Sequence, residues 1–265
     1  MKKIAYTFFM LAAVIATSCS GDDNNNSGNT VETTADYMPL TNSNYWVYNT
    51  STTGAANTSG RDSLYVAKDT VIGTVTYKKI KSRAAATGFF SGSLSGNAIR
   101  QDGSKLLVTG NTSVSLSEQI PFNIAITDFA FFDANATSGQ QIGSTSGSFQ
   151  QTIQGFPLTF TYTLKTTAGD NISSETVNNI AYTGVKTVIT TLQLKISLDL
   201  LSLVILPEQN VVTSTQYFAD GVGAIKTSTD IRYTLADITI PGITLPIPQS
   251  GSAHQDEILV AHNVQ

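Results

Sequence analysis

Cysteine, histidine and charged side chains are all scarce in this chain. Its 265 residues include one cysteine and two histidines, and 13% of them are charged, against about 25% in an average soluble protein. A single cysteine excludes an internal disulfide. The net charge of −4 and the pI near 5.1 argue against nucleic acid as a partner and against charge-driven binding to anionic lipid.

The sequence also lacks the motifs of common catalytic and metal sites. Its two histidines, His254 and His262, lie near the C-terminus, and no Gly-x-Ser-x-Gly or His-Glu-x-x-His pattern is present. With Asp256 and Glu257 they form the densest set of potential metal ligands, which we interpret as a solvated cluster because its spacing matches no such motif. We therefore expect no metal, no cofactor and no catalysis.

One enzymatic alternative stays open, a hydrolase that uses a pair of carboxylates. Such a pair acts only when its two carboxyl groups lie about 5–9 Å apart, which a sequence does not reveal. The available carboxylates are Asp102, Glu118, Asp128, Asp133, Glu175 and Glu208.

Long apolar runs are absent beyond the N-terminus, where one short run carries a targeting signal. Lys2-Lys3 precedes the apolar run 4–16, and small residues follow, which is the pattern of a secretory signal peptide. Ala16-Thr17-Ser18-Cys19 resembles a bacterial lipobox, in which the cysteine receives a diacylglyceryl group. We therefore predict a signal peptide over 1–18 and a lipid on Cys19. Two or more acyl chains on this residue would hold the protein stably at a membrane. The alternative is a plain cleavage site beside a chance cysteine.

The residues after Cys19 predict where the anchored protein goes. Ser20-Gly21-Asp22-Asp23 resembles the surface-export signal of Bacteroidetes lipoproteins, and the polar stretch that follows has little to bury. We interpret 19–35 as the lipidated cysteine and a flexible tether, and 36–265 as a single β-rich domain. The predicted location is the outer membrane, lipid-anchored and exposed at the cell surface, with the membrane as partner through the anchor.

Hydrophobic alternation predicts the fold of residues 36–265. Apolar residues recur at every second position in 122–126 and in 156–164, with threonine between them in the second segment, which indicates half-buried antiparallel strands. Hairpins are predicted around Gly73 and within 175–186. Their similar residue order reflects either duplication of one unit or two unrelated hairpins that use the same kind of turn. We expect an all-β fold, an antiparallel, strongly curved sheet shaped as a half-barrel or sandwich, with at most one short helix.

Other local patterns give more specific expectations. The apolar register of 192–205 shifts near Asp199, which predicts a bulge or short helical turn, and Pro207 is expected to end that strand. The Ser/Thr/Gly-rich segments 50–60 and 133–148 are interpreted as loops. The proline-punctuated apolar segment 238–247 is expected at a rim of the sheet.

Two motifs give the sequence a family resemblance. Tyr37-Met38-Pro39-Leu40, a short turn and Tyr45-Trp46-Val47-Tyr48 resemble the opening of a Bacteroidetes surface lipoprotein family of uncharacterised function. The later stretch Tyr217-Phe218-Ala219-Asp220-Gly221-Val222-Gly223 is similar to that family's second motif. Ser43 stands where the family commonly has glycine, and Ala224 where a larger apolar residue is frequent. The resemblance implies an all-β extracytoplasmic domain and brings no established activity.

Aromatic clusters supply the candidate binding residues. Phe129, Phe131 and Phe132 precede a Gly/Ser-rich segment, so we predict either an exposed ligand-binding patch or a tucked strand edge. Phe89-Phe90 is a further aromatic pair that could contact a sugar, whereas Trp46 is expected in the core. Asp62-Ser63-Leu64 and Asp69-Thr70-Val71 resemble the O-glycosylation acceptor of Bacteroidetes, a weak three-residue pattern.

These observations favour a non-catalytic surface lipoprotein that acts as a binding or interaction module. Within that class we favour an apolar or amphipathic ligand on the concave face of the sheet. The alternatives are a glycan-binding accessory protein of a surface uptake system and the carboxylate-dependent hydrolase.

Overall fold

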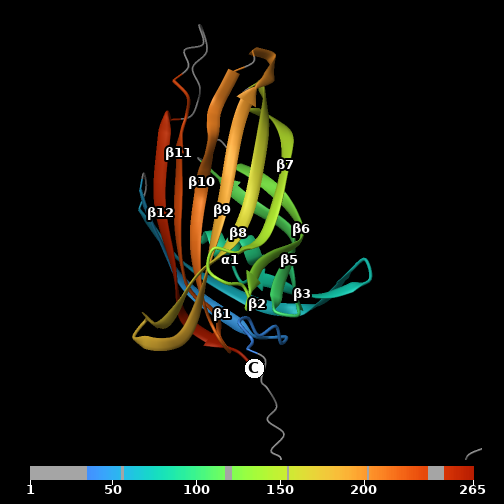
Figure 1. The fold of residues 1–265 in the computed structure, drawn as a ribbon, viewed down its shortest axis with the longest axis vertical. Coiled ribbons are helices and arrows are strands. Elements are labelled where there is room, and N and C mark those ends of the chain that lie inside the picture. The colour runs from blue at the N-terminus through green and yellow to red at the C-terminus, as the bar shows by residue number, and fades with distance from the viewer. Residues whose placement is uncertain (1–34, 55–56, 117–120, 154, 202, 238–247) are drawn as a thin grey trace, which may run out of the picture. The chain divides into compact units, whose positions relative to one another are not determined.

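The computed structural model describes residues 35–54, 57–116, 121–153, 155–201, 203–237 and 248–265 (Figure 1). Residues Ala35–Gln265 form one compact unit. Its elements are β1 (Tyr45–Gly54), β2 (Thr58–Ile72), β3 (Val75–Ser82), α1 (Phe89–Leu94), β4 (Ala98–Asp102), β5 (Lys105–Ser115), β6 (Pro121–Asp133), β7 (Gln141–Ile153), β8 (Phe156–Val177), β9 (Ile180–Leu198), the 3-10 helix η1 (Asp199–Leu201), β10 (Leu203–Ala219), β11 (Gly223–Thr234) and β12 (Ser250–Asn263).

All twelve strands belong to one antiparallel sheet that is nearly closed into a barrel. The strand order is β6-β5-β4-β3-β2-β1-β12-β11-β10-β9-β8-β7, so β1 pairs with β12 and the two halves of the chain meet there. The sheet coils around on itself in Figure 1, with α1 among the strands. The predicted fold class is therefore confirmed, and α1 is the one short α-helix among the described residues, in keeping with the prediction of at most one.

Side chains close the seam between the two edge strands, β6 and β7. The rings of Phe122 on β6 and Phe149 on β7 lie 6.0 Å apart, centroid to centroid. Elsewhere along the seam, the Thr166 hydroxyl of β8 donates to the Ala130 carbonyl oxygen of β6 at 2.6 Å. No backbone ladder joins β6 to β7 within the described residues. The barrel is thus held shut there by packing and by side-chain hydrogen bonds.

The predicted alternation positions the core. On β8, Leu158, Phe160 and Leu164 are buried, and the threonines between them face the other way. The hairpin at Gly73 forms as β2 and β3, and η1 lies at the break predicted near Asp199. These expectations are confirmed.

Three local predictions are wrong for a shared reason. Segments 50–60 and 133–148 were expected as loops, yet most of 50–60 is the β1–β2 hairpin and 141–148 belongs to β7. Pro207 does not end a strand, because register shifts on both sides of it leave it out of the ladder while β10 continues. In each case neighbouring strands supply backbone partners that local composition does not reveal.

The two motifs behind the family resemblance pack against each other. The Trp46 indole donates to the Val222 carbonyl oxygen at 2.6 Å, and the Tyr48 hydroxyl donates to the Ala224 carbonyl oxygen at 2.8 Å. Gly223 has φ +114°, and a Cβ there would lie 2.9 Å from the Trp46 indole nitrogen. Trp46 is 1% exposed, which confirms that it belongs to the core. Glycine at 223 lets the β10–β11 turn approach this ring.

Several predictions concern residues outside the described ranges. These are the signal peptide over 1–18, Cys19, the tether up to 34, Glu118 and the proline-rich segment 238–247. Among the residues that the structure does describe, no helix is long and apolar enough to cross a membrane.

Candidate functional site

Helix α1 is the element around which the candidate site is built. Its sequence is Phe-Phe-Ser-Gly-Ser-Leu, in which every residue but the last is a weak helix former, and its N-cap residue Gly88 provides no side-chain cap. The ring of Phe90 packs edge-on against Tyr48 of β1 and Phe218 of β10, at centroid distances of 6.3 and 6.2 Å. Tertiary contacts, more than helix propensity, therefore stabilise this helix.

Three side chains from the surrounding strands accept the hydrogen bonds of the free backbone N–H groups around the start of α1. Asp62 of β2 accepts from the N–H groups of Thr87 and Gly88, and Gln255 of β12 accepts from that of Phe89 at 2.6 Å. Glu257 of β12 accepts from the N–H groups of Phe90 and Ser91, at 2.6 and 3.1 Å. A helix start leaves such donors unpaired, so these strands supply the cap that the local sequence lacks.

Glu257 is the most deeply buried of these acceptors. Its side chain is fully shielded from solvent, and it also accepts hydrogen bonds from the hydroxyls of Ser91 and Thr227. Burial raises the pKa of the Glu257 carboxyl, while the hydrogen bonds from Ser91 and Phe90 oppose that rise. Burial also raises the pKa of the nearby Tyr48 hydroxyl well above its usual value, with the negative charge of Glu257 adding to the effect.

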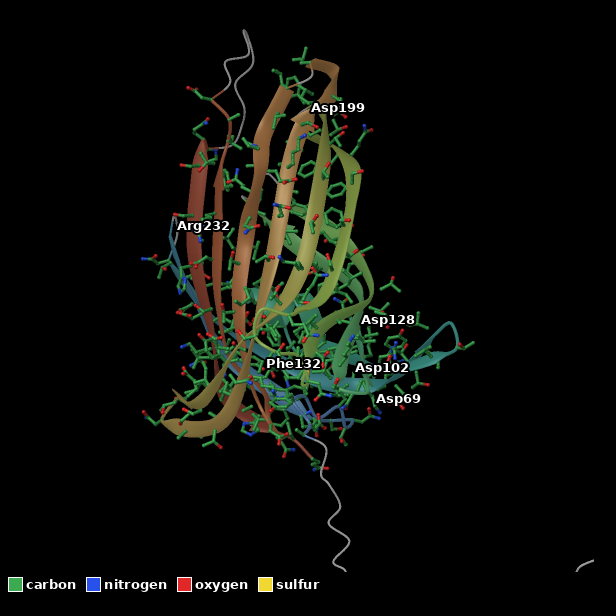
Figure 2. All side chains as sticks on the ribbon, in the orientation of Figure 1. Asp69, Asp102, Asp128, Phe132, Asp199 and Arg232 are labelled. Carbon is green, nitrogen blue, oxygen red and sulfur yellow. The ribbon has the colours of Figure 1, made fainter. Side chains whose placement is uncertain are left out.

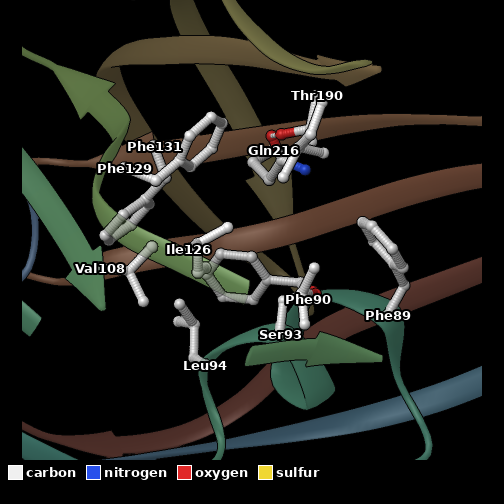
Figure 3. Close-up of a pocket in the computed structure, with 12 residues that line it drawn as sticks. Phe89, Phe90, Ser93, Leu94, Val108, Ile126, Phe129, Phe131, Thr190 and Gln216 are labelled. Carbon is white, nitrogen blue, oxygen red and sulfur yellow. Dashed lines mark hydrogen bonds between the residues drawn. The ribbon is translucent and has the colours of Figure 1, made fainter. Parts of the chain in front are cut away.

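A small apolar cavity lies between α1 and the strands β5, β6, β8, β9 and β10 (Figure 3). Its volume is about 50 Å³. Drug-sized ligands occupy pockets of roughly 300–1,000 Å³, so this space takes a small apolar group, or a larger one only if its walls move. The lining residues are Phe89, Phe90, Ser93, Leu94, Val108, Thr112, Ile126, Phe129, Phe131, Leu164, Thr190 and Gln216.

The structure separates the three phenylalanines that were predicted to bind a ligand. Phe129 and Phe131 lie on one wall of the cavity, as Figure 3 shows. Phe132 points elsewhere and packs in the core against Tyr37 and Phe218, at centroid distances of 4.9 and 4.6 Å. All three are buried, so the exposed patch is wrong and the tucked strand edge is correct. Their role in ligand binding stays a prediction.

One side of the cavity is polar. The Thr190 hydroxyl donates to the Gln216 side-chain oxygen at 3.1 Å, and the Gln216 amide donates to the Ser214 hydroxyl at 2.8 Å. Ser214 in turn shares a hydrogen bond with Thr229 at 2.7 Å. This interior chain places an amide and a hydroxyl on one side of the cavity, and a second hydroxyl pair, Ser93 and Thr112, joined at 2.9 Å, also belongs to its lining. The other lining residues are apolar, which suits a mainly apolar ligand that carries a small polar group.

The carboxylates considered for hydrolysis are dispersed or already paired. Asp102 and Asp128, labelled in Figure 2, both bind Arg100, through contacts of 3.1 and 3.0 Å. The Arg100 guanidinium lowers the pKa of the Asp128 carboxyl, whereas a general acid needs a raised pKa. Glu175 pairs with Lys226, and Asp133 accepts from the Ser104 hydroxyl.

The C-terminal histidine cluster does not assemble as a set. His254 lies between Asp230 and Asp256, at 2.9 and 3.3 Å, and its hydrogen bond to the Asp230 carboxylate is the main cause that raises the pKa of the imidazole. Glu257 points into the interior instead. No group of three or more His, Cys, Asp or Glu side chains that could hold a metal ion occurs in the described part of the chain.

A second, polar cleft of about 450 Å³ lies where β10, β11 and β12 end. Here the side chain of Gln209 makes the two hydrogen bonds that a paired strand residue would make with its backbone. It accepts from the Thr234 N–H and donates to the Thr234 carbonyl oxygen. Arg232, labelled in Figure 2, lines this cleft together with Asn210 and Ser250.

Comparisons with protein-family models, with curated proteins and with solved structures found no match to this chain. Sequence reasoning missed Asp62, Gln255 and Glu257 as the cap of α1, because the N–H groups they accept from lie 25 to 167 residues away. The only signal in the sequence is the spacing of Gln255 and Glu257. They are two residues apart in one strand, so both side chains lie on the same face of β12, and that face is the buried one.

Proposed function

We propose that this chain is a lipid-anchored protein of the outer membrane, exposed at the cell surface, whose β-domain is a non-catalytic binding module for an apolar or amphipathic ligand. The lipobox-like tetrad ending at Cys19 supports the anchor, and no observation on the fold bears on it. The cavity beside α1 supports the binding role, because most of its lining is apolar and its polar groups are one amide and a few hydroxyls.

The size of the cavity limits what such a ligand can be. A volume of about 50 Å³ is a third of the roughly 150 Å³ of an engineered apolar cavity that binds benzene. The proposed ligand therefore places only a narrow apolar end in it, such as the terminus of an acyl chain, with its polar group toward Thr190 and Gln216. A longer chain requires the seam between β6 and β7 to open, since Ile126, Phe129 and Phe131 of β6 line the cavity.

A fluorescent fatty acid with a conjugated polyene chain tests this proposal in a titration. The parent chain is expected to bind the probe saturably, and Val108→Phe, which fills the cavity, to abolish binding. Leu94→Ala, which enlarges the cavity, is expected to tighten it. Leu192→Ala is the matched control, because it truncates a buried leucine that does not line the cavity. Absence of saturable binding by the parent, or equal binding by Val108→Phe, refutes the apolar-ligand proposal.

Glycan binding is the second candidate function, and the polar cleft at the ends of β10 to β12 is the observation that favours it. Amides, hydroxyls and a guanidinium line this cleft, which are the groups that bind sugar hydroxyls and acidic sugars. The aromatic residues first considered for sugar stacking do not support it, since Phe90, Phe129, Phe131 and Phe132 are buried, and the half-buried Phe89 lines the cavity beside α1 and not this cleft. Binding on a glycan array that is lost in Arg232→Ala and retained in Val108→Phe would support this role.

A further inference from the structure

The hairpin formed by β2 and β3 extends beyond its neighbours in the sheet. β1 pairs with β2 only from Thr58 to Tyr65, and β4 pairs with β3 only at Lys78 and Lys79. Residues 70–77 therefore pair only with each other, and they form the end of an arm that projects from the side of the sheet in Figure 1. A projecting two-stranded arm has no core of its own to bury apolar side chains.

The tip of this arm is aliphatic and exposed on both of its faces. Val71, Ile72 and Val75 are 66%, 40% and 38% exposed, respectively. Ile72 pairs directly with Val75, so these two share one face, while Val71, the neighbour of Ile72, lies on the other. A protein partner would cover one face of such a hairpin, whereas insertion of the tip into an apolar medium buries both.

Positive charge is concentrated directly behind the tip. Six of the 15 lysines and arginines of the chain lie between Arg61 and Arg83, whereas the whole chain is acidic. The acidic residues of this range are Asp62, which is buried, and Asp69, which pairs with Lys78 at 2.5 Å. The stretch therefore has a local excess of positive charge that the whole-chain net charge conceals.

Three of the lysines share a face with the apolar tip. Lys68 pairs directly with Lys79, and Lys81 lies two positions beyond Lys79, so all three lie on the face that carries Ile72 and Val75. Two cations placed directly opposite each other destabilise a hairpin unless an anion lies close to both. Lys79 donates to the Gly96 carbonyl oxygen. Asp69 pairs with Lys78, and within the described residues Lys68 and Lys81 have no acidic partner.

We propose that the β2–β3 arm is a membrane-contact element that inserts Val71, Ile72 and Val75 into a bilayer and binds anionic phospholipid headgroups through Lys68, Lys79 and Lys81. Aliphatic side chains gain free energy in the acyl region, and lysines near the surface gain it from the negative potential of anionic lipid. The arm would orient the domain on the membrane, a role distinct from the lipid anchor and from the apolar cavity. It does not depend on either of them.

A site-specific dye tests insertion directly. In the full chain carrying Cys19→Ala, which removes the only cysteine, Ile72→Cys is labelled with an environment-sensitive fluorophore. Vesicles of phosphatidylcholine and phosphatidylglycerol are expected to shift its emission to the blue, and pure phosphatidylcholine much less. Ile180→Cys is the matched control, since Ile180 lies at the β8–β9 hairpin tip and is 50% exposed, near Glu175 and its lysine partner Lys226. The control reports any binding through the N-terminal apolar segment.

Sedimentation with the same vesicles tests the two chemical components. Val71→Ser, Ile72→Ser and Val75→Ser together are expected to weaken binding at least about tenfold. Lys68→Gln, Lys79→Gln and Lys81→Gln together are expected to remove the preference for anionic lipid, at about fivefold per lysine in low salt. Trp46 fluorescence verifies that each variant is folded. An unshifted dye at Ile72→Cys, or equal shifts at both labelled tips, overturns the proposal, as does unchanged binding by the serine variant.

Discussion

Replacement of Glu257 by alanine should destabilise the domain more than any other change to a carboxylate described above. The parent side chain accepts hydrogen bonds from the N–H groups of Phe90 and Ser91 and from the hydroxyls of Ser91 and Thr227. The hydroxyls can rotate to other acceptors, but the two N–H groups would stay buried without one, at about 1–3 kcal/mol each. Relief of a buried charge offsets part of this cost, so we expect a loss of about 2–4 kcal/mol at neutral pH.

The pH dependence of the Glu257 contribution follows from its raised pKa. The native state holds the proton at pH values where the unfolded chain has already released it, so the native state binds more protons in that window. The part of its contribution that depends on titration is therefore present in full below the ordinary value of 4.5 and is lost as the pH rises through the raised native pKa. Glu257→Gln cannot titrate, so the stability gap between parent and this variant should narrow as the pH rises.

Urea unfolding monitored by the fluorescence of Trp46, the single tryptophan, measures these differences. Glu257→Gln keeps one acceptor oxygen and should lose about half as much stability as Glu257→Ala. Glu208→Ala is the control, because Glu208 is exposed on β10 and makes no hydrogen bond or ion pair within the described residues. If Glu257→Ala unfolds at the same urea concentration as Glu208→Ala, the account of how α1 is held in place is wrong.

Three further predictions concern a surface ion pair, a strained turn and the anchor. Asp128→Asn should cost less than about 1 kcal/mol, because its pair with Arg100 is partly exposed. Since Arg100 lowers the pKa of Asp128, that contribution is present above the ordinary value of 3.8 and disappears as the pH falls, which urea midpoints at pH 7 and pH 3 would detect. Ser43→Gly should raise stability by about 0.5–1 kcal/mol, since Ser43 has φ +75°, and an unchanged or lower melting temperature contradicts this. Cys19→Ala should abolish incorporation of a fatty-acid analogue during growth, and equal labelling of variant and parent would refute the lipid anchor.

Strand prediction succeeded where apolar and polar residues alternate and failed where they do not. The face of β8 that carries Phe160 is visible in the sequence, because burial on one side imposes a period of two. β7 consists mostly of serine, glycine, threonine and glutamine, and its pairing with β8 is what shows that it is a strand. Amino-acid composition does not distinguish such a strand from a loop, because the hydrogen bonds between strands are made by backbone groups, which are the same in both.

The candidate site was only partly predictable. Phe129 and Phe131 were identified from their apolar character, but whether they lay on the surface or faced inward depended on how β6 packs over β8. Helix α1 and its acceptors were missed, because a six-residue helix made mostly of weak formers exists only where other strands cap it. The turn at Ser43 was identified through the family resemblance, and the positive φ of this residue gives a physical reason for glycine there.

By itself, the sequence determined that residues 36–265 fold as an antiparallel β-domain, because alternation and turn residues are local properties that any burial of one sheet face requires. It also carried the signal on which the anchor at Cys19 is predicted. Tertiary structure alone decided that twelve strands nearly close on themselves, that two buried carboxylates hold α1, and that lysines of an acidic chain gather behind one aliphatic tip. These features join residues that are far apart in the chain or on opposite strands, and their distances are set only when strand order and register are fixed.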